Sequence, residues 1–328
     1  MSQLTFKKAG LFAIHDTGKP PGVEHYTTLF IVHGFAWHGA VFARMIPFAN
    51  THKTRLVLVN RRDYPGAVPY TASERAALHA SQNPDTTPAG ALTTLLSYAQ
   101  TRALEFHDFL RSFAIEEELS EKTVILAYPP YHALGYPPPP TFYNPLTDPS
   151  HPPGTGIQLF PAWVSGYYTH GDSPHELEHR TPLQDPPPTI LTMTHEEIEG
   201  AVFPGPGEVG GSDEVFLHSG VRCGLWEVLR GRALFVGMND DDEEKEDNVK
   251  GWNDIELRYV WCDRSVWELP WATWALQAEL AEAEKAGREV RKVRLVRLRG
   301  ANHFVHWDEP ERALKALLAD SSEEEEEE

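Results

Sequence analysis

The chain has 328 residues and a net charge of −19, and its hydrophobic fraction of 41% includes 9 Trp, 11 Tyr and 15 Phe. This length and core content suit one large α/β domain with an insertion, or two modest domains. Two acidic segments, 240–247 and 320–328, carry −13 of the −19, so there is neither a nucleic-acid footprint nor a basic membrane patch.

The cysteines and the N-terminal residues indicate the cellular compartment of the protein. Cys223 and Cys262 cannot form a disulfide framework. The N-terminal residues have no apolar segment of the signal-peptide type, and no run of 18 apolar residues occurs. We therefore expect a cytoplasmic protein that does not contact a membrane. Blocks of like charge are typically solvated, so we expect a disordered acidic tail over 320–328. The sequence does not identify a binding partner for this tail.

Strand and helix signals alternate along the first 128 residues. Short alternating runs over 4–9 and 11–15 predict an antiparallel hairpin. Apolar runs predict buried strands, and the spacing of apolar residues predicts amphipathic helices. This alternation indicates a mostly parallel sheet. The predicted strands are 29–32, 55–60 and 123–128, and the predicted helices are 41–49, 73–79 and 90–113.

The composition changes at Pro129. Of the 27 prolines in the chain, 18 lie between Pro129 and Pro206. Proline has no amide hydrogen, so little sheet is expected here, and the many aromatic residues predict a helical, loop-rich cap with a pocket. Beyond this segment, runs over 255–262 and 292–298 predict that the sheet resumes. Helices are predicted over 267–286 and 309–318.

Two residues near the C-terminus are candidates for acid–base chemistry. His303 follows a predicted strand and the turn 299–302, and a histidine just past the carboxyl end of a strand can act as a general base. A structural histidine bonded to a neighbouring backbone group is the alternative. Asp263 ends the strand before it and could orient the imidazole, or it could be an ordinary cap or surface residue. Asp254 and Glu268 are nearby substitutes for Asp263.

A turn near the N-terminus is the candidate binding site for an oxyanion. His33 and Gly34 end the buried strand 29–32, and Phe35 and Ala36 follow. A sharp turn there can leave backbone amides pointing at a ligand. An ordinary turn at the end of a strand would have the same sequence pattern. We predict no cofactor and no metal site, because His303 and His306 have no further cluster of ligands around them.

The order of these motifs resembles the α/β-hydrolase superfamily. The likeness rests on His33-Gly34-Phe35-Ala36-Trp37, Asn60-Arg61-Arg62-Asp63-Tyr64-Pro65-Gly66, the Pro-rich insert, Trp261-Cys262-Asp263 and Gly300-Ala301-Asn302-His303-Phe304. It is closest to the cap-bearing branch that resembles epoxide hydrolases, dehalogenases and small esterases. The resemblance implies His303 as the base, Asp263 as the acid and the Phe35 amide as an oxyanion donor. A shifted alignment would put Ser265 at the place of the acid.

One part of that family pattern is missing. The family's nucleophile lies on a sharp turn between a strand and a helix, usually Gly-x-Ser-x-Gly, and no such motif with Ser, Asp or Cys occurs. The nearest echo, Gly210-Gly211-Ser212-Asp213-Glu214, lacks the preceding strand and the final glycine. Either the strand 123–128 takes the nucleophile position, or a strand–helix unit of about 40 residues has been lost. We favour the loss, by gene decay or a skipped exon.

These observations predict a doubly wound, mostly parallel α/β-hydrolase-like sheet whose central nucleophile strand is deleted. The predicted division is 1–128 for the first part of the core, 129–215 for the cap, and 216–319 for the rest of the core with its acidic loop 240–247. The predicted function is cofactor-independent hydrolysis of a small apolar ester, epoxide or related substrate, with activity that can be degenerate. The alternatives are a non-catalytic protein that binds small molecules, and a truncated gene product.

Overall fold

The protein is described here by a computed structural model that covers residues 4–119, 122–128, 133–152, 154–236 and 255–319. The chain divides into two compact units. The first comprises Met1–Pro130, Thr189–Ser219 and Phe304–Glu328, and the second comprises Tyr131–Pro188 and Gly220–His303. The predicted division into a core of 1–128 and 216–319 and a cap of 129–215 stays a prediction. The predicted acidic loop and acidic tail lie outside the described residues.

The first unit contains a sheet with the strand order β1-β2-β4-β3-β5. Strand β3 pairs in parallel with β4 and with β5, whereas β1 and β2 pair in antiparallel fashion. The apolar runs of β3 and β4 are buried, as expected for strands that are covered on both faces. The predicted hairpin and the three predicted strands are confirmed, and burial is confirmed for β3 and β4. Their bounds are Lys7–Ala9 for β1, Phe12–Asp16 for β2, Thr27–Val32 for β3, Thr54–Asn60 for β4 and Lys122–Ala127 for β5.

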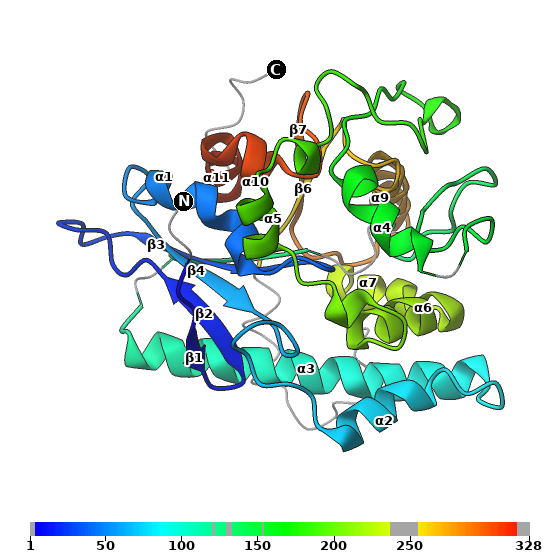
Figure 1. The fold of residues 1–328 in the computed structure, drawn as a ribbon, viewed down its shortest axis with the longest axis horizontal. Coiled ribbons are helices and arrows are strands. Elements are labelled where there is room, and N and C mark those ends of the chain that lie inside the picture. The colour runs from blue at the N-terminus through cyan, green and yellow to red at the C-terminus, as the bar shows by residue number, and fades with distance from the viewer. Residues whose placement is uncertain (1–3, 120–121, 129–132, 153, 237–254, 320–328) are drawn as a thin grey trace. The chain divides into compact units, whose positions relative to one another are not determined.

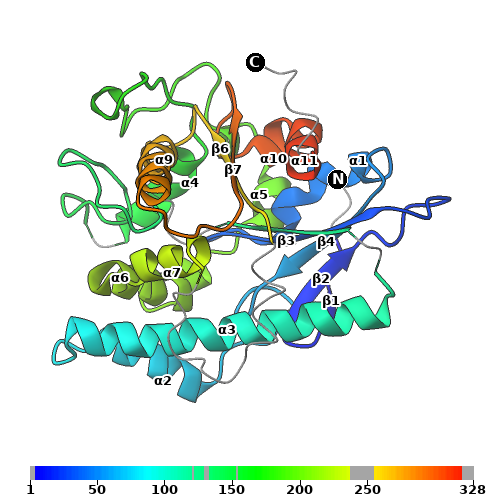
Figure 2. The same ribbon diagram turned by 180° about the vertical axis from the view of Figure 1, so that it is seen from behind.

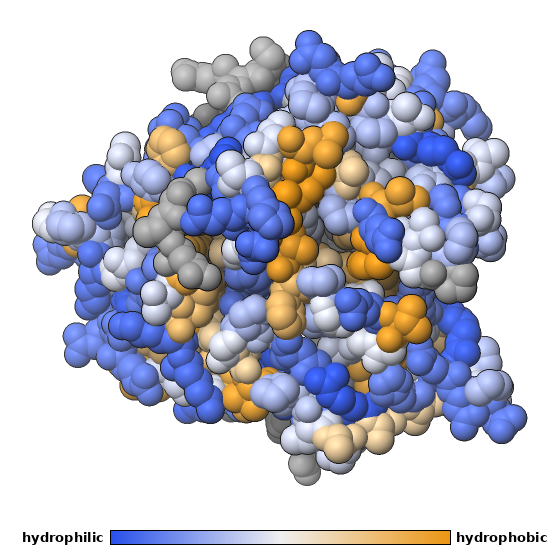
Figure 3. All heavy atoms as spheres, viewed as in Figure 1, coloured by the Kyte–Doolittle hydropathy of each residue, from blue (hydrophilic) through white to orange (hydrophobic). Residues whose placement is uncertain are grey.

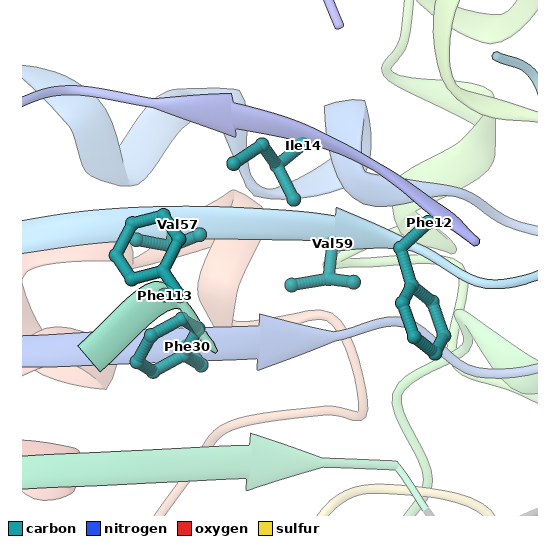
Figure 4. Packing of buried hydrophobic residues seen from close by; sticks show 6 residues of the cluster. All are labelled: Phe12, Ile14, Phe30, Val57, Val59 and Phe113. Atoms are coloured by element: carbon teal, nitrogen blue, oxygen red, sulfur yellow. The ribbon is translucent and has the colours of Figure 1, made fainter. Parts of the chain in front are cut away.

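Helix α3 (Pro88–Glu116) lies along one face of this sheet (Figures 1 and 2). Its Phe113 packs against side chains from β2, β3 and β4, which form the core on this face (Figure 4). The other face is covered by η1 (Gly39–Met45), α1 (Ile46–Ala49), α10 (Val305–Asp308) and α11 (Pro310–Leu318). The cluster in Figure 4 consists of Phe12, Ile14, Phe30, Val57, Val59 and Phe113.

The predicted helix over 41–49 is divided in two. A 3-10 helix, η1, runs to Met45, and the single turn α1 starts at Ile46 with Pro47 in its first turn. Proline fits the first turn of a helix but cannot donate a hydrogen bond from its interior, so the helix restarts there. The predicted helices over 73–79 and 90–113 are confirmed by α2 (Ala72–Ala80) and α3.

Strand β5 is largely exposed. Its Ile125 is paired in register with Phe30 of β3, so both side chains point to the face on which α3 lies. Phe30 is 0% exposed, but Ile125 is 44% exposed. Phe30 is buried because the rings of Phe109 and Phe113 of α3 pack against it, at centroid distances of 6.1 and 5.3 Å.

The second unit contains a separate two-stranded parallel sheet. Strands β6 (Leu257–Cys262) and β7 (Val293–Leu298) pair with each other. The prediction that these strands continue one single sheet therefore does not match the described residues. They have their own apolar cluster, in which α7 (Leu225–Leu234) and α9 (Glu268–Lys285) contribute Leu234, Leu276 and Ala283. The last of these helices confirms the one predicted over 267–286.

The described part of the Pro-rich segment has the helical and loop structure that its composition predicts. Residues 133–152 and 154–188 contain α4 (Thr155–Val164) and the short η2 (Pro174–Glu176), and form turns and loops otherwise. The next segment, Thr189–Ser219, belongs to the first unit. It contains η3 (Thr189–Leu191), α5 (His195–Ala201), η4 (Gly205–Gly207) and the start of α6 (Ser212–Cys223).

Hydrophilic residues predominate on the face drawn in Figure 3, and apolar residues form narrow stripes between them. Scattered apolar residues of this kind are normal on protein surfaces. Within the described ranges, no helix combines the length and the apolar character that crossing a bilayer requires.

Candidate functional site

The carboxyl ends of β4, β3 and β5 form one edge of the sheet in the first unit. From β3 the chain passes to β4 on one side, and it later returns to β5 on the other side of β3. Ligand crevices in open α/β sheets lie at such a point, because the loops that follow neighbouring strands diverge there. The segments at this edge are 33–38 after β3, 61–66 after β4, and Tyr128 after β5.

His33 begins the turn after β3 and is held by two hydrogen bonds. Its Nε2 accepts a hydrogen bond from the Arg61 amide at 3.1 Å, so the ring proton lies on Nδ1, which donates to the Gly34 carbonyl at 2.9 Å. Burial, followed by the charge of Arg61, lowers the pKa of His33 well below its ordinary value. His33 is therefore neutral at pH 7 and fixes the two loops relative to each other.

Gly34 and Ala36 shape the same turn in different ways. A Cβ atom on Gly34 would lie 3.2 Å from the Cβ of Tyr128, so glycine allows the turn to pass close to the end of β5. The left-handed backbone conformation belongs instead to Ala36, with a φ of 63°. A non-glycine residue adopts that conformation at a cost, and contacts around the turn must compensate.

The amide of Ala36 already has a partner. It donates a buried hydrogen bond of 3.1 Å to the hydroxyl of Tyr64, which itself donates to Asp213 Oδ2 at 2.7 Å. Ala36 could therefore bind an oxyanion only if Tyr64 moved away. The oxyanion role of Phe35 stays a prediction, and its ring lies against Gly207, where a Cβ atom would come within 2.7 Å of it.

Arg61 and Asp213 form a two-pronged ion pair beneath this turn. Arg61 Nη1 and Nη2 donate to the two carboxylate oxygens of Asp213 at 2.9 and 2.7 Å, and Nη2 also donates to the Gly34 carbonyl at 2.9 Å. Burial alone would lower the pKa of Arg61, because it disfavours the charged guanidinium. The nearby carboxylate of Asp213 has the larger opposite effect, so the pKa of Arg61 is raised. Asp213, Arg61 and Tyr64 together hold the loop after β3 in place.

A second pair lies at the end of β5. The Tyr128 hydroxyl and His306 Nδ1 are hydrogen-bonded at 2.8 Å. His306 is 3% exposed, and its ring packs beside Phe42 and Phe304. Its Nε2 is buried with no hydrogen-bond partner among the described residues. Burial lowers the pKa of His306 to about 3, so the ring is neutral at pH 7.

We expect His306 to make the protein less stable in mild acid. Between about pH 6.5, the ordinary pKa of histidine, and about pH 3, the unfolded chain binds a proton at His306 and the folded chain does not. Stability is therefore full above pH 6.5 and declines as the pH falls through this window. His306→Gln should reduce the loss of unfolding free energy between pH 6 and pH 5 by about 1 kcal/mol.

Urea denaturation at the two pH values measures this difference, and a slope that stays unchanged in His306→Gln would contradict a buried, neutral His306. The matched control is His25→Gln, because His25 is exposed and should leave the slope as it is. The slope is compared within each variant, so a general loss of stability in His306→Gln does not affect the result.

The predicted acid and base belong to the second unit. Asp263 follows β6, and its Oδ1 accepts a hydrogen bond from the Gly300 amide at 2.7 Å. Its Oδ2 accepts from Arg297 Nε at 3.0 Å. Asp263 thus ties the loop after β6 to the loop after β7 that leads to the half-buried His303. The structure brings the two segments together, and the orienting role of Asp263 stays a prediction.

The other residues considered for the place of the acid have different surroundings. Asp254 lies outside the described residues. Glu268 is buried, and its Oε1 accepts a hydrogen bond from Asn144 at 2.9 Å. Ser265 is 0% exposed, and its hydroxyl has no partner among the described residues.

The predicted oxyanion turn lies in the first unit, and the predicted acid and base lie in the second. Their assembly into one site stays a prediction. In the part of the chain that the structure describes, no group of three or more His, Cys, Asp or Glu residues could hold a metal ion.

Sequence reasoning did not find Tyr128, His306 or Asp213 as members of a site. Tyr64 was part of a recognised motif, but its bond to Ala36 was not predicted. No local signal in the sequence marks Asp213, because its partners lie 152 and 149 residues away. Tyr128 and His306 are 178 residues apart.

Comparison with known proteins gives only distant likenesses. No family model and no curated protein matches this chain. Among solved structures, potato (Solanum tuberosum) epoxide hydrolase I is similar, with a TM-score of 0.43 and 12% identity over 93% of each chain. The epoxide hydrolase from Vigna radiata is also similar, with a TM-score of 0.42 and 10% identity over 97% of each chain. Likeness at this level assigns neither an activity nor a role for any residue to this chain.

Proposed function

We propose that this chain is an α/β-hydrolase-type protein that does not hydrolyse its ligand through a covalent intermediate. The observation that carries the proposal is the end of β5. This strand lies beside β3, and it is followed by Tyr128, whose hydroxyl is bonded to the buried His306. Residues 128–131 read Tyr-Pro-Pro-Tyr and hold no Ser, Cys or Asp that could act as the nucleophile.

The surroundings of the predicted oxyanion turn support the same proposal. The Ala36 amide is engaged by Tyr64, and the loop is fixed by the ion pair between Arg61 and Asp213. An oxyanion hole needs donors that are preorganised and open to the developing charge. A turn whose amide is satisfied within the protein is better suited to holding its own shape than to stabilising an intermediate.

The bare face of β5 supports the loss of a strand–helix unit before it. Sheets with parallel strands normally have helices on both faces. Here α3 covers Phe30, whereas Ile125 beside it is 44% exposed. We infer that a helix once covered this part of the sheet, and that the missing strand and helix carried the nucleophile turn between α3 and β5.

In this proposal the ligand is a small apolar ester, epoxide or related molecule, and the protein is cytoplasmic. Binding without turnover is then the main activity. Any residual hydrolysis would have His303 as the general base for a water molecule, Asp263 as its orienting acid and the Phe35 amide as the oxyanion donor. Without a covalent step, such a reaction is much slower than that of an intact hydrolase.

We expect hydrolysis of p-nitrophenyl acetate to show no initial burst of nitrophenolate, because a burst reports an accumulating acyl-enzyme. His303→Ala should abolish any slow turnover above the rate of unfolded protein and leave the thermal midpoint nearly unchanged. His25→Ala is the matched control for unspecific catalysis by exposed imidazoles. A burst would contradict the proposal, and normal slow turnover in His303→Ala would remove His303 from the mechanism.

A further inference from the structure

Four consecutive prolines, residues 137–140, lie in the loop between β5 and α4, in the second unit. Each proline ring fixes φ at about −65°, and each residue before a proline is pushed towards extended values of ψ. All four prolines follow trans peptide bonds. The run therefore follows the geometry of a polyproline II helix, which has no internal hydrogen bonds and three residues per turn. These four residues accordingly belong to no α-helix or strand.

The burial of the prolines follows this repeat of three. Pro139 is buried and faces the protein, whereas Pro137, Pro138 and Pro140 are exposed. Because residues three apart share one edge of such a helix, Pro137 and Pro140 place two rings on the same exposed edge. Pro138 lies on a second exposed edge beside it. Two of the three edges of the run are therefore open to solvent.

Hydrogen bonds hold the run in place. The indole N–H of Trp271 on α9 donates to the Pro137 carbonyl at 3.0 Å, and the Phe142 amide donates to the Pro139 carbonyl at 3.1 Å. Just before the run, the Tyr136 hydroxyl is also hydrogen-bonded to a side chain of α9. A segment that already has its bound shape loses little conformational entropy when a partner binds it.

We infer that this run is the docking site for a protein domain whose groove is lined by aromatic side chains and binds polyproline II segments. Such grooves recognise prolines three residues apart, and Pro137 and Pro140 present this pattern on one edge. Phe142, which is 44% exposed, adds apolar surface next to the run. The inference uses no predicted catalytic residue and no residue of the first unit, so it stands independently of the proposed function.

Binding of the purified chain to a panel of fluorescently labelled SH3, WW and EVH1 domains tests the inference, with anisotropy as the readout. We expect saturable binding to at least one domain, and a synthetic peptide of residues 136–141 should compete for it. Residues 136–143 carry no charged side chain. The binding should therefore persist at about 1 M sodium chloride, where charges are screened within about 3 Å. Binding to none of the domains, or binding that high salt abolishes, would overturn the inference.

Variants assign the binding to the exposed edge. Pro137→Ala combined with Pro140→Ala removes both rings of this edge and should weaken binding about tenfold. A cooperative urea transition like that of the wild type checks that this variant is folded. The same two substitutions in the competing peptide, which needs no fold, should weaken its competition by a similar factor. Full affinity in the double variant, or undiminished competition by the substituted peptide, would overturn the inference.

The matched control is Pro149→Ala combined with Pro174→Ala. Both prolines are exposed residues of the second unit, and neither has another proline beside it. This control should bind with the affinity of the wild type. A loss as large as that of the double variant in the run would mean that the run is not the docking site.

Discussion

Asp213→Leu should lower the free energy of unfolding by about 2–4 kcal/mol. Asp213 is the carboxylate partner of Arg61, and it also accepts the hydroxyl of Tyr64. Its removal leaves the guanidinium of Arg61, which is 27% exposed, without its counter-charge. Breaking a fully buried pair costs about 3–5 kcal/mol, and the remaining exposure of Arg61 reduces this somewhat.

A double-variant cycle separates the ion pair from other effects of the substitution. Arg61→Met combined with Asp213→Leu removes both charges, and it should cost about 1–2 kcal/mol less than the sum of the two single variants. Glu208→Gln, on an exposed position in the same segment, should stay within about 0.5 kcal/mol of the wild type. Urea denaturation measures the wild type, the two single variants, the double variant and the Glu208→Gln control. If the losses of the single variants simply add up, Arg61 and Asp213 do not act as a pair.

Phe30→Ala should cost about 3–5 kcal/mol of unfolding free energy, whereas Ile125→Ala should cost less than about 1 kcal/mol. The two residues are direct register partners on the same face of the sheet. Phe30 is 0% exposed beneath Phe109 and Phe113 of α3, and Ile125 is 44% exposed. The cost of removing a side chain follows the contacts that it loses, so the pair compares a covered position with a bare one.

The proposed loss of a covering helix predicts this difference between the two variants. Thermal and urea denaturation of the two variants under the same conditions provide the measurement. A loss in Ile125→Ala that equals the loss in Phe30→Ala would mean that something covers this face in solution. Sedimentation of the wild type would then show whether a second copy of the chain is responsible, and the inferred loss of a covering helix would fail.

Local signals in the sequence were sufficient to predict most of the strands and helices of the first unit. The apolar run of β3, the fully buried run of β4 and the long apolar periodicity of α3 each identify an element without any knowledge of the rest of the chain. Such patterns follow from which faces an element buries. The boundary inside η1 and α1 was missed, because the spacing of apolar residues is compatible with both kinds of helix and Pro47 decides between them.

The arrangement of the site could not be read in the same way. Whether a histidine is catalytic or structural depends on its surroundings in space. His306, which lies three residues after His303, is fully packed against Phe42 and Tyr128 from distant parts of the chain. Asp213 looked like part of a failed nucleophile motif, and only the fold shows that its carboxylate faces Arg61. Partnerships over such sequence distances leave no periodic pattern.

The central claim is that this chain forms no covalent intermediate, and intact-mass spectrometry tests it most directly. The purified protein is measured alone, after exposure to a fluorophosphonate probe, and after acid quenching during incubation with p-nitrophenyl acetate. The proposal predicts the mass of the printed sequence in all three spectra. A gain of one phosphonyl or one acetyl group on folded protein would contradict it, and peptide mapping would then identify the nucleophile.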